Sequence, residues 1–381
     1  MKQTRNNRAW IAGTALAVAT ALLAGCAANE GGTTPSTTTP SEGQSETTES
    51  ASTLSGTFAG AGASAQEAAQ AAWIAAFQSD NPDVTINYNP VGSGGGRKQF
   101  IEGATVYAGS DSYLKVEELE GGTAGACAAD SEVYNLPVYI SPIAVVFSLD
   151  GIESLNMDAA TIAKIFKGEI TTWNDPAIAE SNPDTELPQT AITVVHRSDD
   201  SGTTKNFSDY LNKNVPEIWD AEPEDKYPYS FPGAEGAQGS SGVVDAVAGG
   251  AGTIGYVDAS KAGGLSSVAL KVGDDYVHYS PEGAAAIVDA SPRPDEGQPA
   301  NDLAVKVDRT TTEAGVYPLV LVSYLIVCQN YADAKNGEFV KAYASYIVSP
   351  EGQAAAQEGA GSAPISDATR DKILPVLETI K

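Results

Sequence analysis

The clearest structural signal in this 381-residue chain lies at residues 191–211, which read AITVVHRSDDSGTTKNFSDYL. An apolar, β-rich run at residues 192–195 turns polar at Arg197, and Phe207 and Leu211 then follow at helical spacing. Serine and threonine stand where the first residue of a helix is usually capped. The order strand, short loop, helix predicts one unit of an α/β fold.

The start of this predicted helix is suited to binding an anion. The first turn of a helix leaves backbone N–H groups unpaired and carries the positive end of the helix dipole. Arg197, at the end of the strand, adds a planar set of donors that matches two oxygens of a phosphate or a carboxylate. An ordinary strand-to-helix turn with a surface Arg–Asp pair has the same pattern, so the anion hypothesis requires support from other stretches.

The N-terminal region predicts export rather than a folded domain. Three basic residues among the first eight precede an apolar run at residues 9–24, which is the pattern of an export signal. The run closes on Leu-Ala-Gly-Cys, which resembles the lipobox of bacterial lipoproteins, in which Cys26 becomes the lipidated first residue. A plain secretory leader or an anchor helix is the alternative to this lipoprotein signal peptide at residues 1–26.

Residues 27–53 are rich in Thr, Ser, Gly, Glu and Pro and have few apolar side chains. Such a segment cannot bury enough surface to fold, so we expect a disordered tether. A tether behind a lipid anchor predicts an exported protein held at the outer face of the cell membrane.

The charge of the chain restricts its partners. The formal net charge is -27. Such an acidic surface argues against nucleic acid or anionic lipid as a partner. Any bound anion must therefore be captured by local dipoles and one or two cations, against the field of the whole protein.

Two cysteines remain outside the leader, Cys127 and Cys328. An even pair in an exported chain predicts a disulfide, and two buried free thiols are the alternative.

Two further strand-to-helix units precede the first stretch in the sequence. A strand at residues 54–58 runs into Gly60-Ala61-Gly62-Ala63-Ser64, and the spacing of Ser64 and Glu67 predicts a capping box that starts a helix at Ser64. A strand at residues 84–88 leads to the glycine-rich loop 92–96, whose backbone amides could crowd around a ligand. A flexible turn is the alternative for that loop.

A third strand, at residues 105–108, ends before Gly109-Ser110-Asp111. Later apolar runs predict strands at 136–140, 143–147, 253–257 and 318–328, and the chain after residue 331 is mostly helical. Strands alternating with helices predict mostly parallel α/β sheets, in which ligands bind outside the carboxyl ends of the strands. Each glycine- or serine-rich loop lies at such an end.

The residues favour binding without catalysis. His196 and His278 are the only histidines, no His/Cys/Asp cluster has metal-ligand spacing, and no Gly-x-Ser-x-Gly motif is present. His196 adjoins Arg197 in the strand, so it should point to the opposite face of the sheet. We therefore expect a protein that is not an enzyme and has no metal or other cofactor.

The motif Arg197-Ser198-Asp199-Asp200-Ser201-Gly202-Thr203, with the loops at 60–64, 92–94 and 109–111, resembles the phosphate-binding protein of the phosphate ABC transporter. The stretches 165–170, 173–176 and 252–257 are also similar to that family, and the likeness runs in one order from residue 54 to residue 365. The resemblance implies an α/β, two-lobed periplasmic-binding-protein-like fold of the type II solute-binding class, with hinge strands and a cleft. By position, residues 54–139 and 318–381 form lobe 1 and residues 140–317 form lobe 2.

The resemblance also implies a ligand site at named positions. Asp199 is expected to hold Arg197 without touching the ligand. Ser64-Ala65 stands where family members often have Thr-Phe, and Gly94 stands where they often have serine, so either Ser93 or Gly94 makes the contact from the glycine-rich loop. The phosphate-binding residues implied are Ser64, Ala65, Ser93, Gly94, Asp111, Arg197, Ser201, Gly202 and Thr203.

The implied function is high-affinity binding of inorganic phosphate outside the cytoplasm, closure of the lobes on it, and delivery by a monomer to an ABC permease. Phosphate at neutral pH carries at least one proton, for which a fixed carboxylate such as Asp111 is an acceptor, whereas sulfate carries none. Three alternatives stay open: a binder of another oxyanion such as sulfate, molybdate or phosphonate, an extracellular phosphate-scavenging enzyme or phosphatase, and an adhesin or sensor with the same fold.

Overall fold

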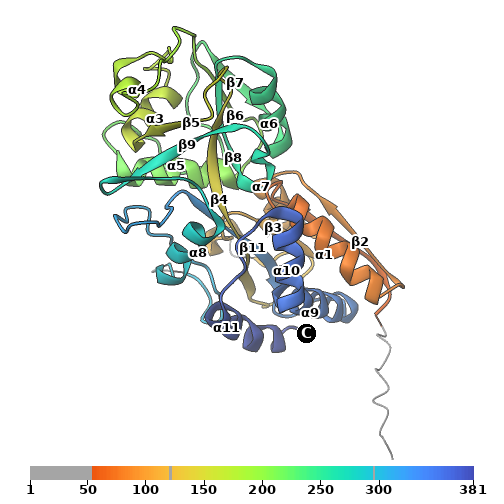
Figure 1. Cartoon of the computed structure of the whole chain (residues 1–381). Helices are drawn as coiled ribbons and strands as arrows, with labels where there is room; N and C mark the ends of the chain where they lie inside the picture. The colour runs from red at the N-terminus through yellow and green to blue at the C-terminus, as the bar shows by residue number, and fades with distance from the viewer. Residues whose placement is uncertain (1–53, 120–121, 295–296) are drawn as a thin grey trace, which may run out of the picture. The chain divides into compact units, whose positions relative to one another are not determined.

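The computed structural model describes residues 54–119, 122–294 and 297–381 (Figure 1). The expected leader, the lipidation site Cys26 and the tether at 27–53 lie outside these ranges. The first lobe is built on β1–β3 and β11, the second on β5–β10, and β4 belongs to both (Figure 1).

In chain order, the elements are β1 (Gly56–Gly62), α1 (Glu67–Asp80), β2 (Val84–Asn89), α2 (Ser93–Ile101), β3 (Tyr107–Ser110), the 3₁₀-helix η1 (Val116–Leu119), β4 (Val133–Phe147), β5 (Ser154–Met157), α3 (Ala159–Phe166), α4 (Pro176–Glu180), β6 (Thr193–Arg197), α5 (Gly202–Asn214), β7 (Ala234–Ala237), α6 (Gly239–Gly249), β8 (Thr253–Asp258), α7 (Ala259–Ala262), β9 (Ser266–Val272), β10 (Asp275–Val277), α8 (Pro281–Ala290), β11 (Val320–Cys328), α9 (Ala334–Val348), α10 (Pro350–Ala360) and α11 (Asp367–Glu378).

The strands are hydrogen-bonded in the order β2-β1-β3-β11-β4-β8-β6-β7, and β9 joins β4 to β5 and β10. Strand β1 runs parallel to β2 and β3, and β6 runs parallel to β7 and β8. Strand β11 is antiparallel to β3 and β4, and β4 is antiparallel to β8. The expectation of mostly parallel sheets therefore holds at the two ends of this order and is wrong in its middle.

Strand β4 connects the two lobes. The runs at 136–140 and 143–147, expected to be separate strands, belong to this one 15-residue strand, in which every residue is buried. Its first part pairs with β11 as far as Pro142, and the next five residues pair with β8. Because proline lacks a backbone N–H, it fits the position where the strand changes partner.

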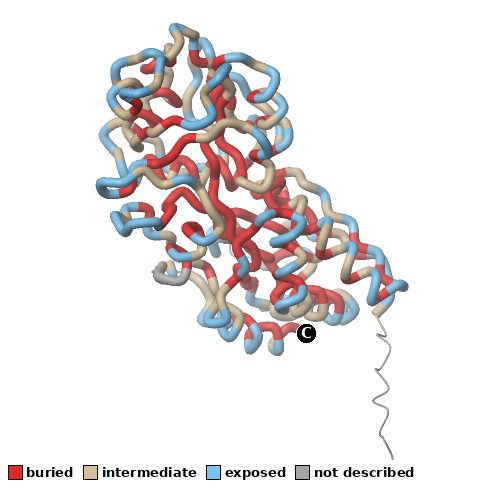
Figure 2. Tube along the Cα trace, viewed as in Figure 1, coloured by how far each residue is buried: buried red, intermediate tan, exposed pale blue. Residues whose placement is uncertain are grey.

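Burial is concentrated along these long strands, as Figure 2 shows for β4 and β11, in which all residues are buried. In the first lobe, the rings of Phe58 and Phe339 stack with centroids 3.8 Å apart. In the second lobe, Phe207 stacks on Tyr256 at 4.3 Å. Each lobe thus has an aromatic cluster of its own beside the shared strand.

Helix α1 does not begin at Ser64, so the predicted capping box is wrong. The helix begins at Glu67, and its N-cap residue Gln66 makes no side-chain capping bond. The buried side-chain amide of Gln66 instead donates to the hydroxyl of Ser323 on β11, at 2.7 Å. Ser64 is thereby left outside the helix, where its hydroxyl contacts the second lobe.

Cys127 and Cys328 form the predicted disulfide, with Cα atoms 5.4 Å apart. The bond closes a loop between residues 201 positions apart, because it joins the loop before β4 to the end of β11.

None of the helices in the part of the chain that the structure describes has both the length and the apolar character required to cross a membrane.

We expect removal of this disulfide to destabilise the protein by about 2–5 kcal/mol, because a long loop loses much conformational entropy when it is cross-linked. Urea unfolding of the double variant Cys127→Ser/Cys328→Ser measures the effect. The parent protein under reducing conditions serves as the control and should unfold at the same urea concentration as the variant. Equal stability of the oxidised parent and the double variant would contradict the expectation.

Candidate functional site

The residues predicted from the sequence lie together where the two lobes meet. Ser64 follows β1, Ser93 begins α2, and Asp111 follows β3, all in the first lobe. Arg197 ends β6 and residues 201–203 begin α5, both in the second lobe. Their side chains are buried, with 3% of Asp111 and 3% of Arg197 exposed, whereas Gly94 is partly exposed. We call this contact surface, formed by Ser64, Ala65, Ser93, Gly94, Asp111, Arg197 and residues 199–203, the lobe interface.

The guanidinium of Arg197 is fixed by Asp199. Its Nε donates to Asp199 Oδ1 at 2.7 Å and its Nη2 donates to Asp199 Oδ2 at 2.5 Å. The backbone N–H of Gly239 donates to the same carboxylate at 3.1 Å. Burial disfavours the ionised carboxyl, but the hydrogen bonds and charge of Arg197 outweigh it and lower the pKa of Asp199. Within the described residues, Nη1 of Arg197 has no hydrogen-bond partner, so this guanidinium keeps a free donor.

Helix α5 begins as its sequence predicts. Ser201 is the N-cap residue, and its hydroxyl accepts a hydrogen bond from the Thr204 N–H at 3.2 Å. Helix geometry leaves the N–H groups of Gly202 and Thr203 without acceptors inside the helix. The start of the helix lies against the first lobe, because the Thr203 hydroxyl donates to Asp111 and Gly202 lies beside Ser93, so the positive end of the helix dipole is directed there.

Asp111 is held from both lobes. Ser323 donates to its Oδ1 at 2.6 Å, and Thr203 donates to its Oδ2 at 3.3 Å. Asn206 on α5 donates to its backbone carbonyl at 2.6 Å. Burial raises the pKa of the Asp111 carboxyl, although the Ser323 hydrogen bond and the positive charge of Arg197 oppose the rise. A carboxylate with a raised pKa is a strong acceptor for a ligand hydroxyl.

The glycine-rich segment is helical where a loop was expected. Helix α2 begins at Ser93, so Gly94 lies in its first turn, and the Gly94 N–H donates to the carbonyl of Asp200 in the second lobe at 3.1 Å. The Ser93 hydroxyl accepts from the Asp111 N–H at 3.0 Å. Both candidates for the contact from this segment therefore lie at the lobe interface, each with a partner.

Glycine is required where the lobes come closest. A Cβ atom on Gly92, whose φ is 90°, would lie 2.6 Å from the Asp199 carboxylate. A Cβ atom on Gly202 would lie 2.5 Å from the Ser93 hydroxyl oxygen. Real Cβ atoms do not approach their neighbours this closely, so these two positions permit the lobes to close.

Comparison with known proteins identifies the family of the chain. A family model described as a PBP superfamily domain matches residues 47–351. Phosphate-binding protein PstS2 of Mycobacterium bovis is 33% identical over 318 residues, which are 81% of this chain and 83% of that protein. Phosphate-binding protein PstS 3 of Mycobacterium leprae is 37% identical over 279 residues, which are 71% of this chain and 73% of that protein. The chain belongs to the phosphate-binding protein family.

A solved phosphate-binding protein from Stenotrophomonas maltophilia has the same fold as this family member. The TM-score is 0.64 at 20% identity, over 84% of this chain and 93% of that chain.

Several interface residues of this family member were missed by sequence reasoning. Ser240, at the start of α6, donates its N–H to the Ser64 hydroxyl at 3.2 Å, so a second helix N-terminus faces the first lobe. Ser323 and Asn206 contact Asp111. The serines at 240 and 241 after a glycine are a visible helix-start signal, whereas Ser323 lies inside an apolar strand and gives no local signal.

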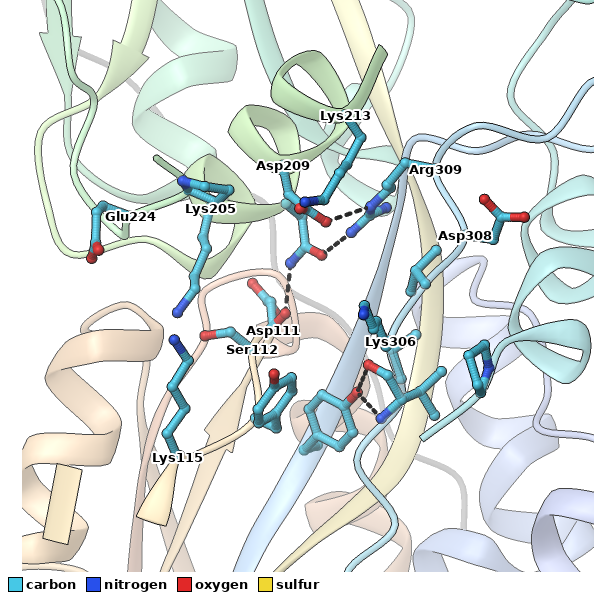
Figure 3. A pocket seen from close by; sticks show the side chains of 18 of the residues that line it. Asp111, Ser112, Lys115, Lys205, Asp209, Lys213, Glu224, Lys306, Asp308 and Arg309 are labelled. Carbon is cyan, nitrogen blue, oxygen red and sulfur yellow. Dashed lines mark hydrogen bonds and ion pairs between the residues drawn. The ribbon is translucent and has the colours of Figure 1, made fainter. Parts of the chain in front are cut away.

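A cavity of about 700 Å³ lies beside the lobe interface, and Asp111 is the one predicted site residue that lines it (Figure 3). Its lining carries five basic and five acidic side chains. Arg309 donates to Asp209 at 3.0 Å and to the carbonyl of Val320 at 2.6 Å. The charged side chains are Lys115, Lys205, Lys213, Lys306, Arg309, Asp111, Asp209, Glu222, Glu224 and Asp308.

His196 lies away from the lobe interface, as strand alternation predicts. Its ring stacks on Tyr227 with centroids 4.1 Å apart. Among the described residues, no group of three or more His, Cys, Asp and Glu side chains is placed to hold a metal ion.

A second buried carboxyl, Asp258, lies at the end of β8. The hydroxyl of Tyr139 on β4 donates to its Oδ1 at 3.1 Å, and the Ser260 N–H donates to the same oxygen at 2.9 Å. Burial raises the pKa of Asp258 to about 6, and the negative charge of Asp111 contributes to the rise.

The variant Asp258→Asn lacks the titrating carboxyl, so we expect its free energy of unfolding to depend on pH differently from that of the parent. The unfolded pKa is about 3.9, so the parent loses stability as pH rises from about 4 to about 6 and loses no more above that range. The free energy of unfolding of the variant minus that of the parent should therefore increase by on the order of 1–3 kcal/mol between pH 4 and pH 7. Urea unfolding at several pH values measures it. A difference in stability that does not depend on pH would refute the assignment.

Proposed function

We propose that this chain binds inorganic phosphate between its lobes and delivers it to an ABC permease. The single observation that carries the proposal is the enclosure, in one interface, of the Arg197 guanidinium, the first turn of α5 and the Asp111 carboxylate. The first two supply donors for oxyanion oxygens, and the third supplies an acceptor for a ligand hydroxyl. The names of the relatives, phosphate-binding proteins PstS2 and PstS 3, support the same ligand.

The proposed ligand contacts are those of the sequence analysis. Arg197, through Nη1, and the N–H groups of Gly202 and Thr203 would bind from the second lobe. From the first lobe, Ser64 with the Ala65 N–H and either Ser93 or Gly94 would add donors, and Asp111 would accept the phosphate proton. Ser201 contributes by capping α5 as well as through its position at the interface.

The proposed binder is exported and is not an enzyme. Attachment through lipidated Cys26 behind the tether at 27–53, with residues 54–139 and 318–381 as lobe 1 and 140–317 as lobe 2, would present a monomer to the permease at the outer face of the membrane. The export signal and the Leu-Ala-Gly-Cys sequence support this arrangement.

Calorimetric titration with phosphate and then with sulfate tests the function. We expect saturable phosphate binding at one site, no release of product, and little sulfate binding. The variant Arg197→Ala should lose about 2–5 kcal/mol of phosphate-binding free energy, because it removes a buried donor and leaves the Asp199 carboxylate without its ionic partner. The variant Lys98→Ala, at an exposed pair 4.0 Å long, is the control. An unchanged dissociation constant for Arg197→Ala would remove this residue from the site.

The variant Asp111→Asn should relax the choice between phosphate and sulfate more than it weakens phosphate binding. The carboxylate accepts the proton of phosphate but repels sulfate, and sites that pair a ligand hydroxyl reject analogues without it by up to about 10⁴–10⁵-fold. The ratio of the two dissociation constants, measured for parent and variant at the same pH, gives the effect. Sulfate rejection as strong in the variant as in the parent would show that Asp111 does not select the ligand.

A further inference from the structure

Arg97, on α2, is a buried cation that the phosphate site described above does not use. Its guanidinium is held within the first lobe by three contacts. Nε donates to Glu118 at 2.9 Å, and Nη1 donates to the hydroxyls of Ser110 at 3.1 Å and Ser112 at 2.9 Å. These partners belong to the same lobe, so they orient Arg97 whether or not the second lobe is close.

The fourth contact of Arg97 comes from the second lobe. Its Nη2 donates to Asp225 Oδ2 at 2.5 Å, and the two side chains are 6% and 15% exposed. Asp225 lies in the segment between α5 and β7, and its backbone carbonyl accepts from the Ser201 N–H at 2.8 Å. Asp225 therefore joins Arg97 directly to the residue that caps α5.

The ion pair with Arg97 offsets the cost of burying the Asp225 carboxylate. Its other oxygen, Oδ1, is buried and has no hydrogen-bond partner among the described residues. A buried carboxylate that loses its partner carries the full desolvation penalty. Lys205 is another cation near Asp225. Its pKa is lowered by burial and by the charges of Arg97 and Lys115, against the attraction of Asp225 and Glu118. Lys205 is therefore a poor substitute for Arg97.

We propose that Arg97 is a positioning residue for ligand capture, which receives Asp225 when the lobes close and fixes the start of α5 against the first lobe. The inference rests on the proposed function in one respect, that the lobes close on a ligand. In the open form, Arg97 keeps Glu118 and both serines, and Asp225 is hydrated. In the closed form, the Arg97–Asp225 ion pair replaces that hydration, so it stabilises the closed form alone.

A double-mutant cycle on the full chain tests the proposal, with variants Arg97→Gln, Asp225→Asn and the two together. Each single variant should raise the dissociation constant for inorganic phosphate by about 10- to 100-fold, mainly through faster dissociation, and the double variant should be little worse than either. Arg97→Lys keeps the charge without the planar donors and should lie between parent and Arg97→Gln. If both single variants bind phosphate as tightly as the parent, the proposal is wrong.

Unfolding of the ligand-free protein separates positioning from a general structural role. Because the ion pair exists only in the closed form, the coupling between positions 97 and 225 should be larger in the phosphate dissociation constant than in the urea midpoint of the ligand-free protein, in which only part of the population is closed. Coupling of equal size in both measurements would overturn the proposal. The matched control is Lys261→Gln, which removes a more exposed pair across the lobes, to Glu67 at 2.9 Å, and should change the constant by no more than about threefold.

The closed fraction of the ligand-free protein gives a readout that does not depend on phosphate. A contact that forms only in one state shifts the equilibrium between states with or without ligand. Spin labels at the exposed Glu102 and Glu169, one in each lobe, should report a smaller short-distance population in Arg97→Gln and in Asp225→Asn than in the parent. Equal populations would overturn the proposal about Arg97, whereas a parent that fails to bind phosphate would overturn the proposed function.

Discussion

The structure depends on keeping one buried guanidinium and one buried carboxylate close together without letting them neutralise each other. The Arg197 guanidinium is hydrogen-bonded to Asp199, and the Asp111 carboxylate accepts hydrogen bonds from Ser323 and Thr203. Each charge therefore has a partner of its own, although the positive charge of Arg197 still acts on the pKa of Asp111. Donor and acceptor capacity for a third group is thus maintained by neighbours that satisfy each charge only in part.

The topology makes this arrangement possible. Parallel strands in each lobe end at the interface, so the loops after β1 and β3 and the end of β6 meet without long connections. The two helix N-termini of α5 and α6 then point at one region from the second lobe. Strand β4 passes between the lobes as one extended segment, and the antiparallel pairing of β11 along its first part provides a rigid base in the first lobe.

Sequence reasoning predicted the parts of this site that are local. The stretch from 191 to 211 contains the strand, the loop and the capped helix that carry Arg197, Asp199 and Ser201. It failed where distant segments decide the outcome. Helix α1 begins at Glu67 because Gln66 bonds to Ser323, and β4 stays continuous through Pro142 because β11 and β8 cover it in turn. The pairing of Arg97 with Asp225 spans 128 positions and leaves no pattern in either segment alone.

The closeness of Gly202 to Ser93 and Asp111 limits the size of the side chain that position 202 can carry. A single methyl group at position 202 would meet the Ser93 oxygen at 2.5 Å and the Asp111 Cβ at 2.7 Å. This steric clash would hold the two lobes apart, although every donor and acceptor of the interface would still be present. The two lobes thus fit together at this point with no room for one added carbon atom, and their closure depends on this steric fit as much as on their hydrogen bonds.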